Sequence, residues 1–157
     1  QRVIRSQEYI YIWNAKPDRW PSGAPQRISP KDTTQLLPMY GLDTQGKYIQ
    51  QGAFTDIDDC PSKTFIIENY DKETVRPYFD LIENKRPEFE LYNVVEDPFC
   101  LNNLAGNPAV SETENELFSV LMKELNRTND PRVVGPNKEI FDSYIRYMAL
   151  RKFPKPE

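Results

Sequence analysis

The hydrophobic pattern at the start of the chain predicts a β-hairpin. Residues 3–5 (Val-Ile-Arg) and 9–13 (Tyr-Ile-Tyr-Ile-Trp) are mostly apolar or aromatic and flank the polar triplet 6–8, which suits a tight turn between two strands. Read in alternation, the second strand carries isoleucines on one face and aromatic residues on the other. Because both faces are bulky, we expect this strand to be covered on both sides.

The stretch 14–52 shows no regular period. Five prolines interrupt it, and proline is excluded from helix interiors and central strands. A short helix fits residues 31–40, where Leu36, Leu37 and Tyr40 stand at helical spacing. Loops of this length usually carry function or pack against a neighbour, so this segment is a candidate functional region.

Two strands and a helix are predicted in the middle of the chain. Residues 64–68 form an apolar, β-branched run typical of a strand, and residues 91–95 form another. Between them, apolar residues recur at i, i+3, i+4 and i+7 over 75–82, which is the period of an amphipathic helix. Thr74 stands where an N-cap would, and Pro77 then lies in the first turn, where its missing N–H costs little.

Two further helices are predicted in the last third. The run 111–114, Ser-Glu-Thr-Glu, is a capping-box sequence that opens a helix with leucine and methionine on one face up to residue 125. A turn region follows over 127–135. Asn137 then caps a last helix, whose inward side chains are Ile140, Phe141, Tyr144, Ile145 and Met148.

These elements predict the fold class. We expect an α+β fold in which a small antiparallel sheet of about four strands has helices packed on one side. Residues 1–152 form a single subdomain with the long irregular loop at 14–52, and residues 153–157 form a frayed tail. A chain of 157 residues has the size of one domain and can bury roughly 70% of its unfolded surface.

Composition and charge exclude several classes of protein. Hydrophobic residues make up 38% and charged residues 28%, as in globular domains. The net charge of −4 argues against a general nucleic-acid surface. No run approaches the roughly 20 apolar residues of a membrane span, and no signal peptide is present. Because the chain begins with Gln1 rather than Met, we interpret it as an excised or processed fragment.

Candidate catalytic chemistry is sparse. The chain has no histidine, the usual general base and activator of nucleophiles. Catalysis by a pair of carboxylates, as in glycosidases, is an alternative that needs no histidine. Asp56, Asp58 and Asp59 form either a solvated acidic loop or a cation site, and they lack the spacing of a calcium-binding EF-hand loop. Cys60 and Cys100, the only cysteines, are either two buried thiols or a disulfide.

Two segments resemble parts of the sulfatase family. Residues 90–105 resemble the signature "ELYDL…DP…E..NLA" near the carboxyl end of sulfatases. Residues 2–13 are similar to the "RVIRT..YKYI" entry into their C-terminal subdomain. In this chain Asn93 replaces the usual Asp, and residues 100–101, Cys-Leu, interrupt the acidic part of the signature.

Further segments resemble the heparan N-sulfatase (sulfamidase)-like branch of that family. Residues 14–21 are similar to its "N..PDR" segment and residues 128–132 to its "T.DPR" segment. Its "SK..L.E" and "KRP.EELYD" segments correspond to residues 62–68 and 85–93. The matches keep the family's order and together span most of the chain.

The resemblance implies a C-terminal subdomain packed on a larger α/β catalytic domain of the alkaline-phosphatase type. That domain, the expected partner, would hold the formylglycine, the calcium ion and the catalytic His and Lys residues. The substrate would be a sulfate ester or N-sulfate on a glycosaminoglycan or other sulfated sugar. The parent enzyme would be periplasmic or secreted, or lysosomal in a eukaryote.

The motif that generates formylglycine, Cys/Ser-x-Pro-x-Arg, does not occur in this chain. Residues 60–63 read Cys-Pro-Ser-Lys, so the proline follows the cysteine directly and the lysine stands one place too early for the arginine. We therefore predict that this chain alone is inactive. Cys60 is interpreted as the lead-in to the strand 64–68.

Lys16, Arg19 and Trp20 are the candidate substrate-binding residues. A guanidinium binds sulfate oxygens bidentately, and an indole can lie against a sugar face. The alternative is that Arg19 pairs within the chain and Trp20 packs in the core. Lys85 and Arg86 are interpreted as a charge pair favoured by the dipole at a helix C-terminus.

The sequence is also compatible with two other functions. The chain is alternatively a stand-alone module that binds sulfated polysaccharide without cleaving it, or an independent carboxylate-based hydrolase. No catalytic residue, metal ligand or cofactor is assigned to the chain itself.

Overall fold

A computed structural model describes residues 1–50 and 52–142 of the chain, which form two compact units. Among these residues, unit 1 comprises 1–17 and 87–142, and unit 2 comprises 18–50 and 52–86. The described chain contains one three-stranded antiparallel sheet and four α-helices, which confirms the α+β class. No helix within it is long and apolar enough to cross a membrane.

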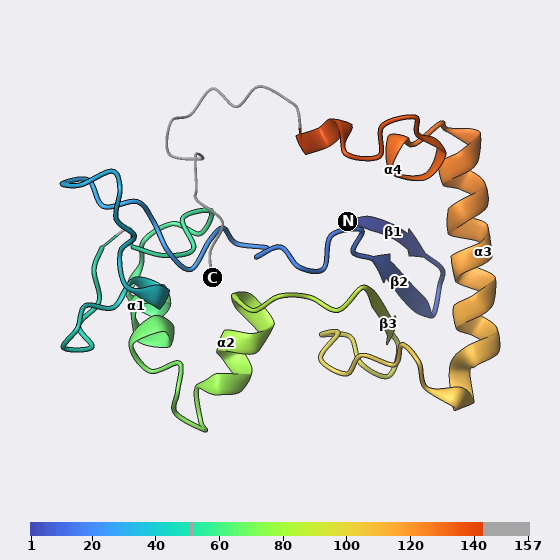
Figure 1. Cartoon of the computed structure of the whole chain (residues 1–157). Helices are drawn as coiled ribbons and strands as arrows, with labels where there is room; N and C mark the ends of the chain where they lie inside the picture. The colour runs from blue at the N-terminus through green and yellow to red at the C-terminus, as the bar shows by residue number, and fades with distance from the viewer. Residues whose placement is uncertain (51, 143–157) are drawn as a thin grey trace. The chain divides into compact units, whose positions relative to one another are not determined.

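The sheet lies in unit 1 and has the strand order β1-β2-β3 (Figure 1). Its strands are β1 (Arg2–Arg5), β2 (Tyr9–Trp13) and β3 (Phe89–Asn93), and both pairs are antiparallel. The predicted hairpin is therefore confirmed. Ser6 closes its turn, because Ser6 Oγ accepts from the backbone N–H of Tyr9 (2.9 Å).

Helix α3 (Ser111–Arg127) packs against one face of this sheet, and buried apolar side chains fill the space between them. Tyr11 and Leu91 are direct cross-strand partners, so their side chains share a face. The core cluster consists of Tyr11, Leu91, Leu121 and Leu125. This confirms both the aromatic face predicted for the second strand and the apolar face predicted for the helix.

Two local predictions in unit 1 were wrong. Strand β3 ends at Asn93 rather than at residue 95, because Asn93 Oδ1 accepts from the backbone N–H of Val95 (3.0 Å) and bends the chain. The capping box does not form at Ser111. Glu114 Oε2 instead accepts from the backbone N–H of Gly106 (2.8 Å), and a 3₁₀ turn (Pro108–Val110) leads into the helix.

The end of unit 1 is built from short elements. The predicted turn region contains the one-turn helix α4 (Pro131–Val134), because Asp130 caps it and Pro131 suits its first position. Asn137 Oδ1 accepts from the backbone N–H of Glu139 (3.0 Å), ahead of a 3₁₀ turn (Ile140–Asp142). Three residues of the predicted last helix lie outside the described residues: Tyr144, Ile145 and Met148.

Unit 2 is organised around a second, largely aromatic core. Helices α1 (Pro61–Glu68) and α2 (Arg76–Ile82) and a 3₁₀ turn (Met39–Gly41) are its regular elements. The buried cluster consists of Ala53, Phe54, Ile67 and Phe79. The backbone also packs closely at Gly52, since an added Cβ there would lie 2.7 Å from Gly41 Cα, and only glycine allows this approach.

The strand predicted over residues 64–68 was wrong, because these residues belong to α1. Cys60 is the N-cap, and its Sγ accepts from the backbone N–H of Lys63 (3.5 Å). Pro61 follows in the first turn, where proline starts helices well. The start signal and the burial of Lys63 and Ile67, four residues apart, therefore override the β-propensity of the run.

The helix predicted over residues 31–40 was also wrong. Ser29 and Asp32 bind backbone N–H groups through their side chains, at 3.2 Å to Lys31 and 2.9 Å to Thr34. Such local bonds compete with helical ones. By contrast, the amphipathic helix predicted over residues 75–82 is confirmed as α2, although Val75 rather than Thr74 stands at its N-cap.

Candidate functional site

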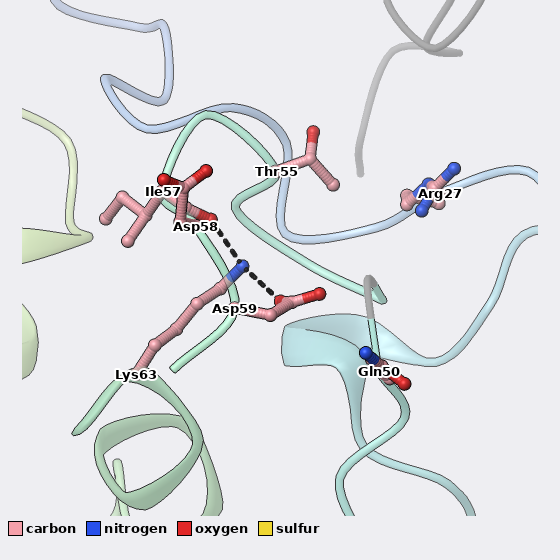
Figure 2. Close-up of a pocket in the computed structure, with 7 residues that line it drawn as sticks. All are labelled: Arg27, Gln50, Thr55, Ile57, Asp58, Asp59 and Lys63. Atoms are coloured by element: carbon pink, nitrogen blue, oxygen red, sulfur yellow. Dashed lines mark hydrogen bonds and ion pairs between the residues drawn. The ribbon is translucent and has the colours of Figure 1, made fainter. Parts of the chain in front are cut away.

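The most unusual side chain of unit 2 is the buried lysine of α1. The side chain of Lys63 is only 2% exposed, although lysine is almost never fully buried unless it is paired. Its ammonium donates to the carbonyl oxygen of Ile57 (2.9 Å) and to Asp59 Oδ1 (3.1 Å), as Figure 2 shows. Helix α1 thus anchors the acidic loop that precedes it.

Asp59 is the charge partner of this lysine. Its Oδ1 also accepts from the phenol of Tyr48 (2.9 Å). Burial alone would raise the pKa of Asp59, but the bonds from Lys63 and Tyr48 and the nearby positive charges hold that pKa below its usual value. Asp59 therefore stays ionised in the folded protein at neutral pH.

Glu83, next to the C-terminus of α2, is a second buried ionisable group. It is 1% exposed, and burial raises its pKa to about 7, while the positive charge of Lys63 acts in the opposite direction. Its Oε2 has no hydrogen-bond partner among the described residues. Unit 2 thus holds a buried carboxyl group that titrates near neutral pH.

A pocket of about 350 Å³ opens beside Lys63. Side chains from three segments of unit 2 surround it (Figure 2). They are Arg27, Gln50, Thr55, Ile57, Asp58, Asp59 and Lys63. Two cations and two carboxylates face the same space, so the pocket is polar but has no net charge.

The structure places the predicted substrate-binding residues in different units. Lys16 lies in unit 1, where its ammonium pairs with Glu139 Oε1 (2.5 Å). Arg19 and Trp20 lie in unit 2, and Arg19 is exposed. The indole of Trp20 packs edge-on against Phe54, with ring centres 5.7 Å apart, so it contributes to the aromatic core.

The basic pair after α2 is engaged within unit 2. The Arg86 guanidinium donates to the carbonyl oxygen of Leu81, which matches a basic residue at a helix C-terminus. The Lys85 ammonium lies 5.3 Å from the centre of the Trp20 ring, a cation–π distance.

The acidic loop does not form a metal site in the described part of the chain. No group of three or more His, Cys, Asp or Glu side chains is gathered there that could hold an ion. Asp59 is bound to Lys63, and the formylglycine motif is missing from the sequence. The residues present therefore do not fit the calcium ion or the formylglycine of a sulfatase, and no reaction step is assigned to them.

The two cysteines are unpaired thiols. Cys60 is exposed at the start of α1, whereas the sequence suggested a buried thiol, and Cys100 is half-buried. They lie in different units, Cys60 in unit 2 and Cys100 in unit 1.

A buried polar network crosses the sheet face of unit 1 opposite α3. Glu90 is 5% exposed, and each of its carboxylate oxygens accepts one bond: from Asn14 Nδ2 (2.7 Å) and from the phenol of Tyr92 (2.6 Å). Asn14 Nδ2 also donates to the carbonyl oxygen of Pro87 (2.6 Å). The carboxylate thereby joins two segments that are 76 residues apart.

Removing the phenol from this network is expected to destabilise unit 1. Tyr92→Phe takes one hydrogen bond from a buried carboxylate, which costs about 2 kcal/mol of unfolding free energy. Tyr9→Phe is the control, because its phenol oxygen bonds to no other described residue. Urea unfolding of both variants measures the difference, and equal losses would contradict a structural role for the Glu90 network.

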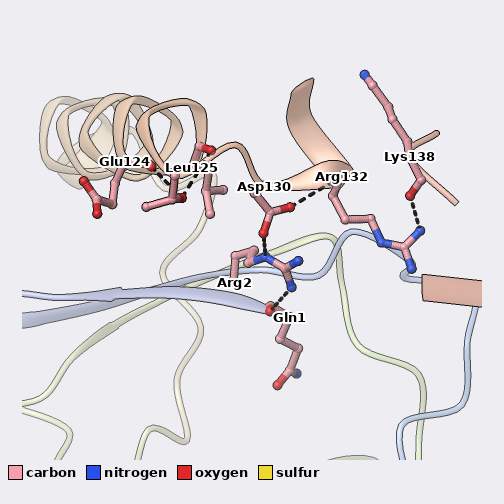
Figure 3. Close-up of polar contacts among 8 residues, drawn as sticks. Gln1, Arg2, Glu124, Leu125, Asp130, Arg132 and Lys138 are labelled. Atoms are coloured by element: carbon pink, nitrogen blue, oxygen red, sulfur yellow. Dashed lines mark hydrogen bonds and ion pairs between the residues drawn. The ribbon is translucent and has the colours of Figure 1, made fainter. Parts of the chain in front are cut away.

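A second long-range contact joins the hairpin to α4. Arg2 Nε donates to Asp130 Oδ2 (2.6 Å), and Asp130 Oδ1 accepts from the backbone N–H of Arg132 (2.9 Å), as Figure 3 shows. Burial alone would raise the pKa of Asp130, but these bonds and the two guanidinium charges lower it. Asp130 thus caps α4 and ties it to β1.

Sequence reasoning missed Lys63 as a residue of the pocket and Glu83 as a buried carboxyl group. The spacing of Asp59 and Lys63 at i and i+4 is a usable signal, but only once residues 61–68 are recognised as a helix. Glu83 has no such signal, because a carboxylate at the end of a helix is more often exposed than buried.

Comparisons with known proteins found no match. The chain matches no protein family, no curated protein and no solved structure.

Proposed function

We propose that this chain is the C-terminal subdomain of a sulfatase, similar to the heparan N-sulfatase-like branch. The parent enzyme hydrolyses sulfate esters or N-sulfates on sulfated sugars. This subdomain completes the fold and lines the substrate cleft, and the nucleophile and calcium ion belong to a separate catalytic domain. The enzyme acts in the periplasm, outside the cell or in the lysosome.

The main support is that the segments carrying the resemblance contact one another in pairs. Asn14, from the segment 14–21, binds Glu90, from the segment 85–93. Arg2, from the entry hairpin, binds Asp130 in the segment 128–132. These contacts give the matched segments a structural role, which is consistent with their lack of catalytic residues.

The predicted contact residues have different places in this proposal. Arg19 is exposed and keeps the role of a sulfate-binding guanidinium. Trp20 is half-buried, so it supports the wall of the cleft through Phe54. Lys16 pairs with Glu139, and its contribution is to hold unit 1 together.

The catalytic division of labour has a direct test. The isolated chain should not hydrolyse N-sulfoglucosamine or an aryl sulfate, because it has no histidine and no formylglycine motif. The intact gene should encode, upstream of Gln1, a domain that carries Cys/Ser-x-Pro-x-Arg, and the whole protein should be active. Turnover by the isolated chain, or an intact gene without that motif, would contradict the proposal.

The alternative, a stand-alone module for sulfated polysaccharide, differs in binding. Calorimetry of the isolated chain with heparan sulfate oligosaccharides should show no micromolar binding if the chain completes an enzyme. The net charge of −4 supports that expectation, since sulfated polysaccharides are polyanions. Specific micromolar binding would instead identify the stand-alone module.

A further inference from the structure

The Lys63 pocket contains hydrogen-bonding groups that no other described residue uses. The Asp58 carboxylate, the Thr55 hydroxyl and the Gln50 amide line the pocket and make no side-chain hydrogen bond within the described chain. An ammonium can donate three hydrogen bonds, and Lys63 donates two of them, to Ile57 and to Asp59. The pocket therefore offers acceptors, donors and groups that do both.

The charge balance restricts what such a pocket can bind. Arg27 and Lys63 are offset by Asp58 and Asp59, so a sulfate entering this space would face two carboxylates. The Lys63 ammonium is already paired with Asp59, which leaves little attraction for an anion. A neutral ligand avoids this repulsion.

Hydroxyl groups match the unused partners, because each hydroxyl both donates and accepts. The Asp58 carboxylate can accept from two neighbouring hydroxyls, while Thr55, Gln50 and Lys63 can donate to others. The volume of about 350 Å³ is at the small end of the roughly 300–1,000 Å³ of ligand sites.

We propose that the Lys63 pocket binds an uncharged, hydroxyl-rich sugar ring that carries no sulfate. The inference rests on the proposed function, in which it adds a subsite for an unsulfated unit of the substrate. The specificity comes from Asp58, Thr55 and Gln50. The bonds from Lys63 to Ile57 and Asp59 hold the loop that contains Asp58.

Titration of the ¹⁵N-labelled 157-residue chain with glucose, followed by NMR, tests this subsite. A ligand with so few atoms should bind with a dissociation constant on the order of 1 mM. The shifted backbone amides should be those of residues 55–58 and 63, and those of unit 1 should not move. Glucose 6-sulfate is the matched probe and should bind no more tightly.

Two variants locate the binding. Asp58→Ala should weaken glucose binding at least about tenfold, because it removes a charged acceptor. Asp58 is exposed, so the fold should be unaffected. Asp71→Ala, an exposed aspartate of the same unit outside the pocket, should leave the affinity unchanged.

Three results would contradict the proposed sugar subsite. Absence of shifts at glucose concentrations far above the millimolar range shows that no sugar ring binds. Binding of glucose 6-sulfate alone, weakened by salt, shows an anion site instead. Glucose binding that survives Asp58→Ala places the ligand elsewhere. In none of these cases is the sulfatase assignment contradicted, because that depends on the upstream motif and on turnover.

Discussion

Replacing Phe79 with alanine is expected to destabilise unit 2 by about 3–5 kcal/mol. Phe79 is 1% exposed, and its ring centre lies 5.3 Å from that of Tyr40 and 5.8 Å from that of Phe54. Three or more aromatic rings share this core, so the cavity left by the deletion cannot close by the movement of one side chain.

Tyr78→Ala is the matched control for this change. Tyr78 precedes Phe79 on α2 but is 60% exposed, so its loss should change the unfolding free energy by less than about 0.5 kcal/mol. Urea unfolding followed by circular dichroism, with hydrogen exchange of unit 2 amides, measures both variants. A loss in Tyr78→Ala as large as in Phe79→Ala would show that α2 buries a different face.

Glu83→Gln is expected to stabilise the protein by about 3 kcal/mol at pH 8 and to have little effect near pH 4. The pKa of Glu83 is about 7 in the folded protein, against an ordinary 4.5. Between these values the folded state holds a proton that the unfolded state has lost. Stability of the unmodified protein therefore falls as the pH rises through this window, and the penalty is complete above pH 7.

Glutamine does not titrate, so the variant escapes this penalty. Glu68→Gln is the control, because it makes the same chemical change at an exposed position of α1. Unfolding free energies at pH 4, 6 and 8 measure the effect. If the gain in unfolding free energy from Glu83→Gln does not grow with pH, burial does not raise the pKa of Glu83 in the folded protein.

The two units divide the roles that the proposed function requires. Unit 1 contains the buried Glu90 network and the Arg2–Asp130 pair, which are contacts that maintain a fold. Unit 2 contains the pocket with unused polar groups and the buried Lys63. Substrate contact is therefore proposed for unit 2 and structural completion for unit 1.

The candidate site was predictable only in part. Arg19 and Trp20 were predicted from the loop and from the resemblance, and both lie in unit 2, but neither of them lines the pocket. Lys63 was considered only as part of a cysteine motif that does not fit, and residues 64–68 were predicted to form a strand. As a helical residue it is instead buried one turn after Asp59.

The sequence alone determined the hairpin, α2 and α3, because the turn of the hairpin and the hydrophobic period of the two helices are local patterns. Only the tertiary structure decided that residues 61–68 are a helix, since that depends on the burial of Lys63 and Ile67 beneath other segments. The pairing of Asn14 with Glu90 and the burial of Glu83 were likewise settled in three dimensions. Desolvation depends on neighbours that are distant in the chain, and no local pattern encodes them.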